Sequence, residues 1–546
     1  MTQINSHPAS RHRAVVGAIG ALIVVALAGC SASAPATEST GDAPSAIQSL
    51  VIAGNDVTGL DPASIRSTSG SLVNRNIYGT LFLQQMDIDP DGTLTPIDSY
   101  EPGIAQSITW ADDGLSAVIT IDPDARFASG EPILAEDAVY SIQRTLSSVS
   151  TSRGLALFMG IADAAADVSA IDDSSFSIVL NHTTAVLEKM LSFQSFAILD
   201  KTVADEHATT DDPWALEFFA TETTPSGPYE IQDWTAGSSL TLAPSPETSQ
   251  LLDTSATSVT LDVIPDATQR LLAVSGGAAD IALELPPELL AEAAKNPELS
   301  VTVDPTGSVH YLGFDDTIAP FDDVRVRQAI SLAVPYDAIT DAVMLGYGQV
   351  AGGPIPEPIA GSAGLDLAYK TDLDQARQLL EDAGHSAGDI QVDLAVSSAI
   401  SAHVQAATFV QEALGEIGIT VNVTPLSNAD FSQRRLEHSL PMFISWWSSW
   451  GMDPFYQLYF LLRSGVPTNF VGYSNPELDD LIDRGIVSTD STERDELALA
   501  AQKIALEDAP MAYLFTDGTA IVRRADLQGV GSGDDRQPRL ELIAQQ

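Results

Sequence analysis

The chain has 546 residues, of which 45% are hydrophobic, and a formal charge of −49. This length predicts two or three domains of ~100–200 residues each, with enough apolar material for large cores. So acidic a chain repels phosphate, which argues against nucleic acid as a partner and against direct adhesion to anionic lipid. Cys30 is the only cysteine, so no internal disulfide can form.

The first thirty residues have the pattern of an export signal. Arg11 and Arg13 precede an apolar run at residues 14–28, and the run ends in Leu-Ala-Gly-Cys at Cys30. This order is typical of a secretory signal, and the run is shorter than the ~20 residues of a bilayer span. Its end resembles a bacterial lipobox. We therefore expect residues 1–29 to be a lipoprotein signal peptide, although an ordinary signal with an incidental cysteine is an alternative.

The expected mature protein begins at a lipidated Cys30 and lies outside the cytoplasm. It would be anchored to the cell membrane, in the periplasmic space or on the outer face. Residues 31–45 carry no large apolar side chain and cannot build a core, so residues 30–45 are expected to form a flexible tether.

Folded structure is expected from about residue 46, with a first strand at residues 50–52. Residues 108–121 alternate around an Asp-Asp-Gly turn, which predicts a hairpin. A helix follows and ends near Leu146, with Leu134 at the position where an N-capping Ser or Thr is usual.

The clearest periodicity lies between residues 372 and 447. Asp372 can cap a helix that Gly384 ends. Strand, helix and strand then follow with short connections, which predicts a parallel βαβ unit. The pattern places helices at 373–383 and 402–417, and strands at 390–396, 419–423 and 442–447.

Motifs of enzymatic catalysis are missing from the sequence. It has no Gly-x-Ser-x-Gly elbow, no His-Glu-x-x-His and no phosphate-binding loop, and its eight histidines show no metal-ligand spacing. We therefore expect no catalytic residue, no metal and no cofactor, and we expect that the protein is not an enzyme.

Three of the six tryptophans, Trp446, Trp447 and Trp450, lie within five residues at the end of a predicted strand. Ligands bind beyond the carboxyl ends of strands in open α/β sheets, and tryptophan offers a large rigid face with one N–H donor. Because strand residues alternate, at least one of Trp446 and Trp447 should be buried. Asp453 precedes Pro454 and is expected to form a turn.

Several motifs in a fixed order resemble one protein family. They are Phe-Ala-Ser-Gly-Glu-Pro at 127–132, Gly-Pro-Tyr at 227–229, Tyr-Leu-Gly-Phe-Asp at 311–315, Pro-Phe-Asp-Asp-Val-Arg-Val-Arg-Gln-Ala-Ile at 320–330 and Leu-Leu-Glu-Asp-Ala-Gly at 379–384. In order and spacing the chain is similar to the extracytoplasmic solute-binding proteins of ABC importers, in the family that includes dipeptide, oligopeptide and nickel binders. The resemblance covers essentially the whole mature chain.

The resemblance implies an α/β fold of the periplasmic-binding-protein type, with two lobes, an extra subdomain and a hinge. Lobe I would comprise residues 46–305 plus 510–546, with an extension at about 95–220. Lobe II would comprise residues 306–509. The lobes would close on a ligand by hinge motion.

One departure from the family bears on the ligand. Peptide binders of the family carry an aspartate that grips the ligand's terminal amine, and Trp450 stands at that place here. Trp450 could instead stack on a sugar ring, an aromatic group or a quaternary cation.

The sequence thus predicts the lipid-anchored, monomeric substrate-binding component of an ABC transporter. It would capture a small solute, in the first place a peptide, and deliver it to a permease with its ATPase. A carbohydrate or an aromatic or cationic solute is the alternative ligand, and nickel has less support because no histidine cluster is present. More remote alternatives are a secreted hydrolase and a signalling lipoprotein without a transport role. The expected ligand-binding residues are Trp446, Trp447, Trp450, Asp453, Tyr456 and Asn469.

Overall fold

The computed structural model describes residues 47–64, 67–147, 150, 152–248, 256–359 and 369–545. Cys30 and the tether at residues 30–45 lie outside these ranges. Within them, no helix is both long and apolar enough to cross a bilayer. The described strands form one seven-stranded, one six-stranded, one four-stranded and two two-stranded sheets.

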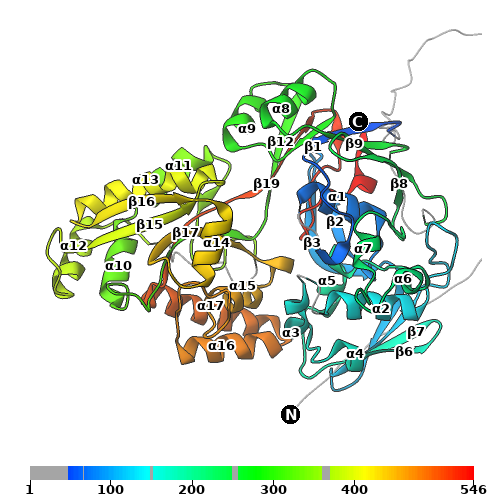
Figure 1. The fold of residues 1–546 in the computed structure, drawn as a ribbon, viewed down its shortest axis with the longest axis horizontal. Helices are drawn as coiled ribbons and strands as arrows, with labels where there is room; N and C mark the ends of the chain where they lie inside the picture. The colour runs from blue at the N-terminus through cyan, green and yellow to red at the C-terminus, as the bar shows by residue number, and fades with distance from the viewer. Residues whose placement is uncertain are drawn as a thin grey trace, which may run out of the picture. The chain divides into compact units, whose positions relative to one another are not determined.

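The seven-stranded sheet has the order β12-β19-β11-β1-β10-β9-β8 (Figure 1). Its strands are β1 (Leu50–Gly54), β8 (Tyr229–Thr235), β9 (Ser239–Pro244), β10 (Val259–Val263), β11 (Ile281–Leu283), β12 (Leu299–Pro305) and β19 (Gly518–Arg524). The predicted first strand is confirmed as β1, which pairs in parallel with β10 and β11. Apolar side chains of α1 (Thr68–Ile77) cover one face, and those of α8 (Ala267–Ser275) and α9 (Pro287–Ala293) cover the other.

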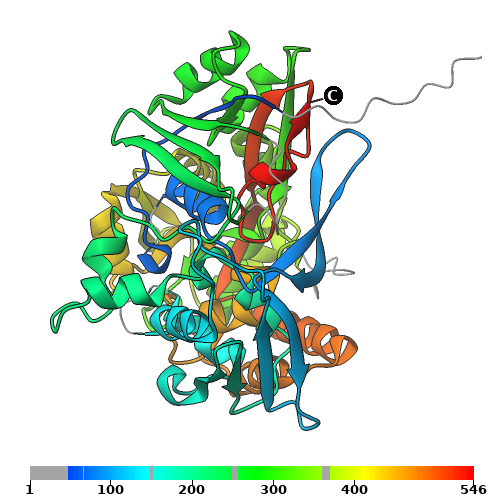
Figure 2. The same ribbon diagram turned by 90° about the vertical axis from the view of Figure 1, so that its right-hand side faces the viewer.

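The region at 95–220 contains a four-stranded antiparallel sheet in the order β4-β5-β7-β6 (Figure 2). Its strands are β4 (Ala105–Trp110), β5 (Ser116–Ile121), β6 (Val168–Asp172) and β7 (Ser175–Val179). The predicted hairpin is confirmed, because β4 pairs with β5 and Gly114 has a φ of 67° in the turn. The predicted helix is confirmed as α2 (Ala135–Thr145). Its entry is fastened by Asp137, whose carboxylate accepts a hydrogen bond from the Leu134 N–H at 2.8 Å.

Shorter elements surround these two sheets. The helices among them are α3 (Ala156–Met159), α4 (Ala164–Asp167), α5 (Leu187–Leu191), α6 (Lys201–His207), α7 (Leu216–Phe219) and the 3₁₀ turns η1 (Pro62–Ser64), η2 (Arg153–Leu155), η3 (Gln194–Phe196), η4 (Trp450–Met452) and η5 (Leu540–Leu542). The strands among them form two antiparallel pairs, β2 (Phe82–Ile88) with β3 (Leu94–Pro102), and β20 (Leu527–Gln528) with β21 (Ala544–Gln545).

The six-stranded sheet has the order β14-β18-β13-β17-β15-β16. Its strands are β13 (Ser308–Phe314), β14 (Gln349–Val350), β15 (Gln391–Ser397), β16 (Thr420–Leu426), β17 (Met442–Ser448) and β18 (Met511–Thr516). The helices of this part are α10 (Val324–Ala333), α11 (Tyr336–Met344), α12 (Leu373–Asp382), α13 (Ser401–Glu416), α14 (Asn428–Leu436), α15 (Pro454–Leu462), α16 (Pro476–Val487) and α17 (Ser491–Asp508). The predicted βαβ unit is confirmed: α13 connects β15 to β16, and these strands pair in parallel.

Helices cover both faces of the six-stranded sheet, and the alternation along each strand decides which core a residue joins. On β13, Leu312 and Phe314 pack into a cluster with α10–α13. Val309 and Tyr311 point to the opposite face and join a second cluster with α15–α17. This second cluster also contains Phe158 and other residues of the 95–220 region, so the two parts of the chain share a core.

Two short segments connect the large sheets. Thr306 and Gly307 lie between β12 and β13, and Asp517 lies between β18 and β19. The two crossings are neighbours, since the Thr306 hydroxyl lies 3.4 Å from the Asp517 carbonyl oxygen. The expected division at residue 510 would assign Met511–Thr516 to the first lobe, whereas these residues form β18 and pair with β13 in the six-stranded sheet.

Candidate ligand-binding site

A cavity of about 700 Å³ lies beside the two crossing segments. Its wall includes the start of α1 and η3 on one side, and β13 with the end of β17 on the other. Residues 517–519 and the loop at 534–537 complete the wall. The volume falls within the range of ~300–1,000 Å³ that is usual for small-molecule sites.

Trp446 and Trp450 present partly exposed indole rings to this cavity. Trp446 stands near the end of β17, opposite His310 of β13, and the two rings have centroids 6.4 Å apart. Trp446 is 44% exposed and Trp450 is 41% exposed, which is high for so large an apolar residue. Both rings are therefore available for contact with a ligand.

A glycine allows the turn that carries Trp450. After β17 the chain turns through η4, and Gly451 has a φ of 75°. A Cβ atom at this position would lie 2.8 Å from the Phe193 ring, which also lines the cavity. Only glycine satisfies both the left-handed backbone and this close approach.

Trp447 and Tyr456 pack into the core instead of the cavity. The Trp447 ring lies 5.7 Å from that of Phe460, and Tyr456 packs between Phe158 and Phe460 at 5.3 and 4.7 Å. The expectation that alternation buries one of Trp446 and Trp447 is met in part, because Trp447 is half-buried and Trp446 is exposed. Neither Trp447 nor Tyr456 lines the 700 Å³ cavity.

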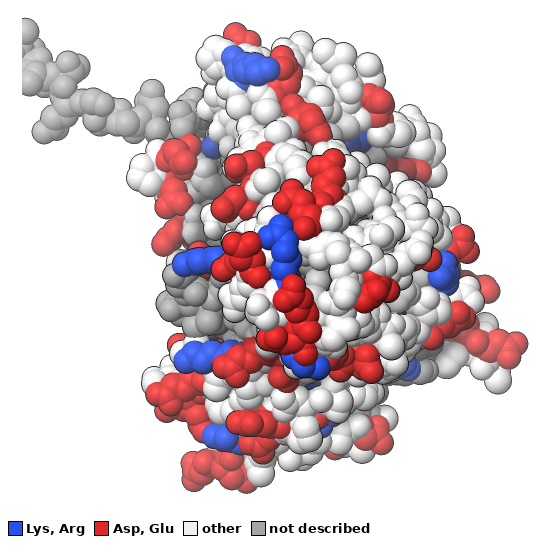
Figure 3. Space-filling model, turned by 90° about the vertical axis from the view of Figure 1, so that its left-hand side faces the viewer, with Lys and Arg blue, Asp and Glu red and all other residues white. Residues whose placement is uncertain are grey.

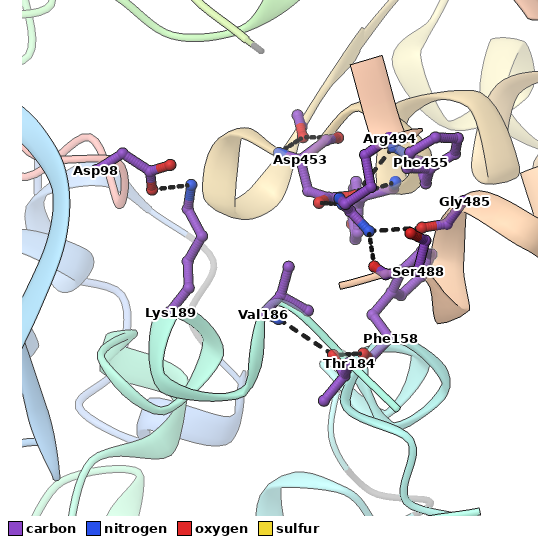
Figure 4. A network of polar contacts seen from close by, with 12 residues as sticks. Asp98, Phe158, Thr184, Val186, Lys189, Asp453, Phe455, Gly485, Ser488 and Arg494 are labelled. Atoms are coloured by element: carbon purple, nitrogen blue, oxygen red, sulfur yellow. Dashed lines mark hydrogen bonds and ion pairs between the residues drawn. The ribbon is translucent and has the colours of Figure 1, made fainter. Parts of the chain in front are cut away.

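Asp453 is engaged at the start of α15. Its carboxylate accepts hydrogen bonds from the N–H groups of Phe455 and Tyr456 at 2.9 Å each, which caps the helix. It also forms an ion pair with Arg494, as Figure 4 shows, and both side chains are nearly buried. The residue thus lines a second cavity of about 430 Å³, beside Lys189, and not the first.

Asn469 is buried, and its side chain holds the backbone of the loop that follows α15. Its side-chain amide lies within hydrogen-bond distance of the carbonyl oxygens of Leu462, Arg463 and Tyr473, at 2.8 to 3.3 Å. Of the six expected ligand-binding residues, the structure therefore brings Trp446 and Trp450 to the cavity. It places Trp447, Asp453, Tyr456 and Asn469 in packing, capping and ion-pair contacts nearby.

A histidine pair lies at the cavity wall, where His310 is a lining residue. The Nδ1 atom of His310 lies 2.9 Å from the Nε2 atom of His403. The Nε2 atom of His310 lies 3.1 Å from the Asp517 carboxylate. Burial, with a further contribution from His310, lowers the pKa of His403 to about 3, so His403 is neutral at pH 7. The two histidines are 93 residues apart, and no local pattern in the sequence could have paired them.

No cluster of three or more His, Cys, Asp or Glu side chains suited to a metal occurs in the described ranges. The loop at 534–537 supplies a charged group that no sequence motif indicated. Arg536 lines the cavity, and its Nη2 atom donates to the Ser449 carbonyl oxygen at 3.4 Å. Its place in the wall depends on contacts with distant parts of the chain, so a local pattern could not have predicted it.

The chain is similar in sequence to a known family of binding proteins. Residues 99–469 match the family described as "Bacterial extracellular solute-binding proteins, family 5 Middle". The chain is 27% identical over 476 residues to a probable D,D-dipeptide-binding periplasmic protein of Escherichia coli K12, covering 86% of this chain and 88% of that protein. It is also 27% identical to heme-binding protein A of Haemophilus influenzae Rd, covering 90% and 91%.

Solved structures show the same fold. The periplasmic binding protein DppA of Helicobacter pylori, in complex with the peptide STSA, superimposes with a TM-score of 0.75 at 22% identity, covering 92% of this chain and 98% of that chain. All three of these relatives are named as binding proteins, and none of their names describes an enzyme.

Proposed function

Because this chain belongs to family 5 of the bacterial extracellular solute-binding proteins, which serve ABC importers, we propose that it binds a short peptide and delivers it to an ABC permease. The observation that carries the proposal is the cavity of about 700 Å³ with Trp446 and Trp450 in its wall. A binding role needs a preformed concave site with a few polar groups, and this cavity provides one.

The chemistry of the wall suits a peptide. Thr68 and Thr519 line the cavity and are partly exposed, so their hydroxyl groups can exchange hydrogen bonds with peptide N–H and C=O groups. The two tryptophans offer apolar faces to side chains of varied shape. The relative that is named as a D,D-dipeptide-binding protein supports the same ligand class.

Two lobes that close on the ligand are part of the proposal. We assign residues 47–305 and 517–545 to the first lobe and residues 306–516 to the second, with hinges at the two crossings. Because the cavity wall draws on both, a bound peptide would bridge the lobes and favour the closed form.

Anchoring by a lipid at Cys30 and a monomeric state complete the proposal. The lipobox-like end of the export signal supports the anchor, and the tether at residues 30–45 would let the lobes reach the permease. If the substitution Cys30→Ser moves the protein from the membrane fraction to the soluble fraction, the anchor is supported. If the variant stays on the membrane, this part of the proposal is wrong.

Identification of the co-purified ligand tests the proposal that the ligand is a peptide. The chain from Ser31 onward is purified and examined by native mass spectrometry, and released small molecules are then identified under denaturing conditions. A stoichiometric peptide is the expected result. A sugar or a non-peptide aromatic solute would instead favour the alternative suggested by Trp450. If the protein is empty, thermal-shift screening of free dipeptides and tripeptides decides, and failure of every peptide would contradict the proposal.

A further inference from the structure

The loop from Ser532 to Pro538 is firmly fastened to the first lobe. Both the N–H and the hydroxyl of Ser532 donate to the Asp304 carboxylate, at 2.7 and 2.8 Å. The Asp534 N–H donates to the side-chain oxygen of Gln84 at 2.9 Å, and Ser532 forms an isolated bridge with Pro538. These contacts hold the tip of the loop at a defined place in the cavity wall.

The two carboxylates of this loop belong to residues that line the cavity, but both are engaged by cations of the protein. Asp535 lies between Arg75 and Arg539, at 3.2 and 2.8 Å. Asp534 accepts a hydrogen bond from the Tyr100 hydroxyl at 3.3 Å and lies 3.4 Å from the Lys189 ammonium. The acidic side chains of the loop are thus neutralised by neighbouring cations.

Arg536 follows Asp535 in the loop. Unlike the two aspartates, it has no partner of opposite charge within ion-pair distance in the described part of the chain. No ion pair joins its guanidinium to a carboxylate within the described part of the chain, and its one hydrogen bond is the contact of 3.4 Å with the Ser449 carbonyl. Its backbone has a φ of 61°, a conformation that side-chain-bearing residues seldom adopt. The loop therefore presents a cation to the cavity and leaves most of its donors unused.

The surroundings of Arg536 disfavour an unpaired cation. Burial lowers its pKa, and the nearby Asp517 offsets this only in part. Asp517 itself is engaged by His310, whose Nε2 atom lies 3.1 Å away. Arg536 is half-buried, and an arginine that has lost part of its solvent without gaining a carboxylate is stabilised by an anion that enters the cavity.

We propose that Arg536 binds the terminal carboxylate of the peptide, while Trp446 and Trp450 contact the residues next to it. The guanidinium can hold a carboxylate through two parallel hydrogen bonds. A doubly charged phosphate suits the site less, because Asp517, Asp534 and Asp535 also line the cavity. This inference rests on the proposed peptide function and names the end of the peptide that is recognised.

A free-acid peptide and its C-terminal amide, compared as ligands, test whether Arg536 binds the terminal carboxylate. A library of free-acid dipeptides and tripeptides is screened on the purified full-length protein, and the tightest binder is remade as its C-terminal amide. Calorimetry then measures both forms on the wild type, on Arg536→Gln and on the control Arg484→Gln, which removes the same charge from an exposed pair on α16. The wild type should bind the acid about ten- to a hundredfold more tightly than the amide.

In Arg536→Gln the preference for the acid should fall to within about threefold, while Arg484→Gln should retain it. Arg536→Lys keeps the charge and should retain part of the preference. A fold defect would instead weaken both ligand forms equally and lower the melting temperature of the free protein. Equal binding of acid and amide by the wild type, or an unchanged preference in Arg536→Gln, overturns this inference but leaves the peptide function standing. Absence of binding by every peptide overturns both.

Discussion

Trp446 and Trp447 are neighbours in the chain but have different surroundings, because successive side chains of β17 point to opposite faces. Trp446 faces the cavity with Trp450, whereas Trp447 packs on Phe460. Residues that the sequence groups together thus divide into ligand contacts that we propose and side chains that pack against the core.

Substitution of Trp450 tests this division. We expect Trp450→Ala to weaken peptide binding by about five- to fiftyfold, because a large aromatic contact is lost from the cavity wall. Trp447→Phe is the matched control, and it should lower the free energy of unfolding by about 1 kcal/mol and leave affinity unchanged. Isothermal titration calorimetry measures both affinities, and an affinity of Trp450→Ala within twofold of the wild type would show that the ring is not a ligand contact.

Asp304 predicts a pH dependence of stability. Burial raises its pKa to about 6, although the hydrogen bonds from Ser532 oppose the rise. Because the folded-state pKa lies above the ordinary value, the stabilising contribution is complete below pH ~3.8 and is lost as pH rises through about 6.

The variant Asp304→Asn removes this titration. Its unfolding free energy relative to the wild type should therefore increase by about 3 kcal/mol between pH ~3.5 and ~7.5, at about 1.36 kcal/mol per pH unit. Denaturant unfolding across this range measures the difference. A difference that does not change with pH would contradict the raised pKa, and Ser532→Ala should raise that pKa further.

Among the elements, helix starts show how local signals and distant partners combine. Asp372 caps α12 by accepting from the Gln375 N–H at 2.9 Å, as the sequence predicts. Asp453 caps α15 in the same way but is also the carboxylate partner of Arg494 on α17. The Arg494 guanidinium also donates to the carbonyl oxygens of Gly485 and Ser488, so this one network joins α15, α16 and α17 (Figure 4).

A comparison of the N-caps Asp372 and Asp453 separates the contribution of capping from that of the Asp453–Arg494 ion pair. We expect Asp372→Ala to lower the free energy of unfolding by about 1 kcal/mol, the usual contribution of an N-cap. Asp453→Ala should cost about 3–5 kcal/mol, because it also leaves a nearly buried arginine without its carboxylate. Urea unfolding of both variants provides the measurement, and equal losses would show that the Asp453–Arg494 pair adds nothing to the cap.

At the scale of the whole molecule, acidic side chains are spread over the face seen in Figure 3, with basic ones lying singly among them. This distribution agrees with a role of the −49 charge in solubility. The two large sheets are connected by the crossings at residues 306–307 and 517, and the cavity lies beside them. In the function that we propose, motion about these crossings opens and closes the cavity.

Small-angle scattering tests this closure. A saturating free-acid peptide should decrease the radius of gyration of the wild type, because a ligand that contacts both lobes favours the form in which they are close. The same peptide concentration should have a smaller effect on Trp450→Ala if its affinity is lower. An unchanged radius of gyration in the ligand-saturated wild type would argue against hinge motion.

Local pattern was sufficient for most elements between residues 372 and 447, although helix α14 was not predicted. Helix α12, strands β15 and β16 and helix α13 were predicted because their apolar residues repeat at the period of a helix or a strand, and because Asp372 and Gly384 are local start and stop signals. The family was also predictable, because its motifs are short and keep a fixed order. The tryptophan cluster also indicated the edge of the sheet at which the structure has the 700 Å³ cavity.

Which of those side chains reach the cavity depends on tertiary packing. Asp453 pairs with Arg494, His310 meets His403, and Arg536 reaches Ser449, each across at least 41 residues of sequence. Strand β18 likewise joins β13 from far along the chain. Such contacts depend on how elements pack, and packing energy depends on the shape and charge of surfaces that are assembled from distant segments. The periodicity of a single segment does not indicate these distant contacts. Local sequence therefore specifies the elements and the family, whereas tertiary packing decides which side chains reach the cavity.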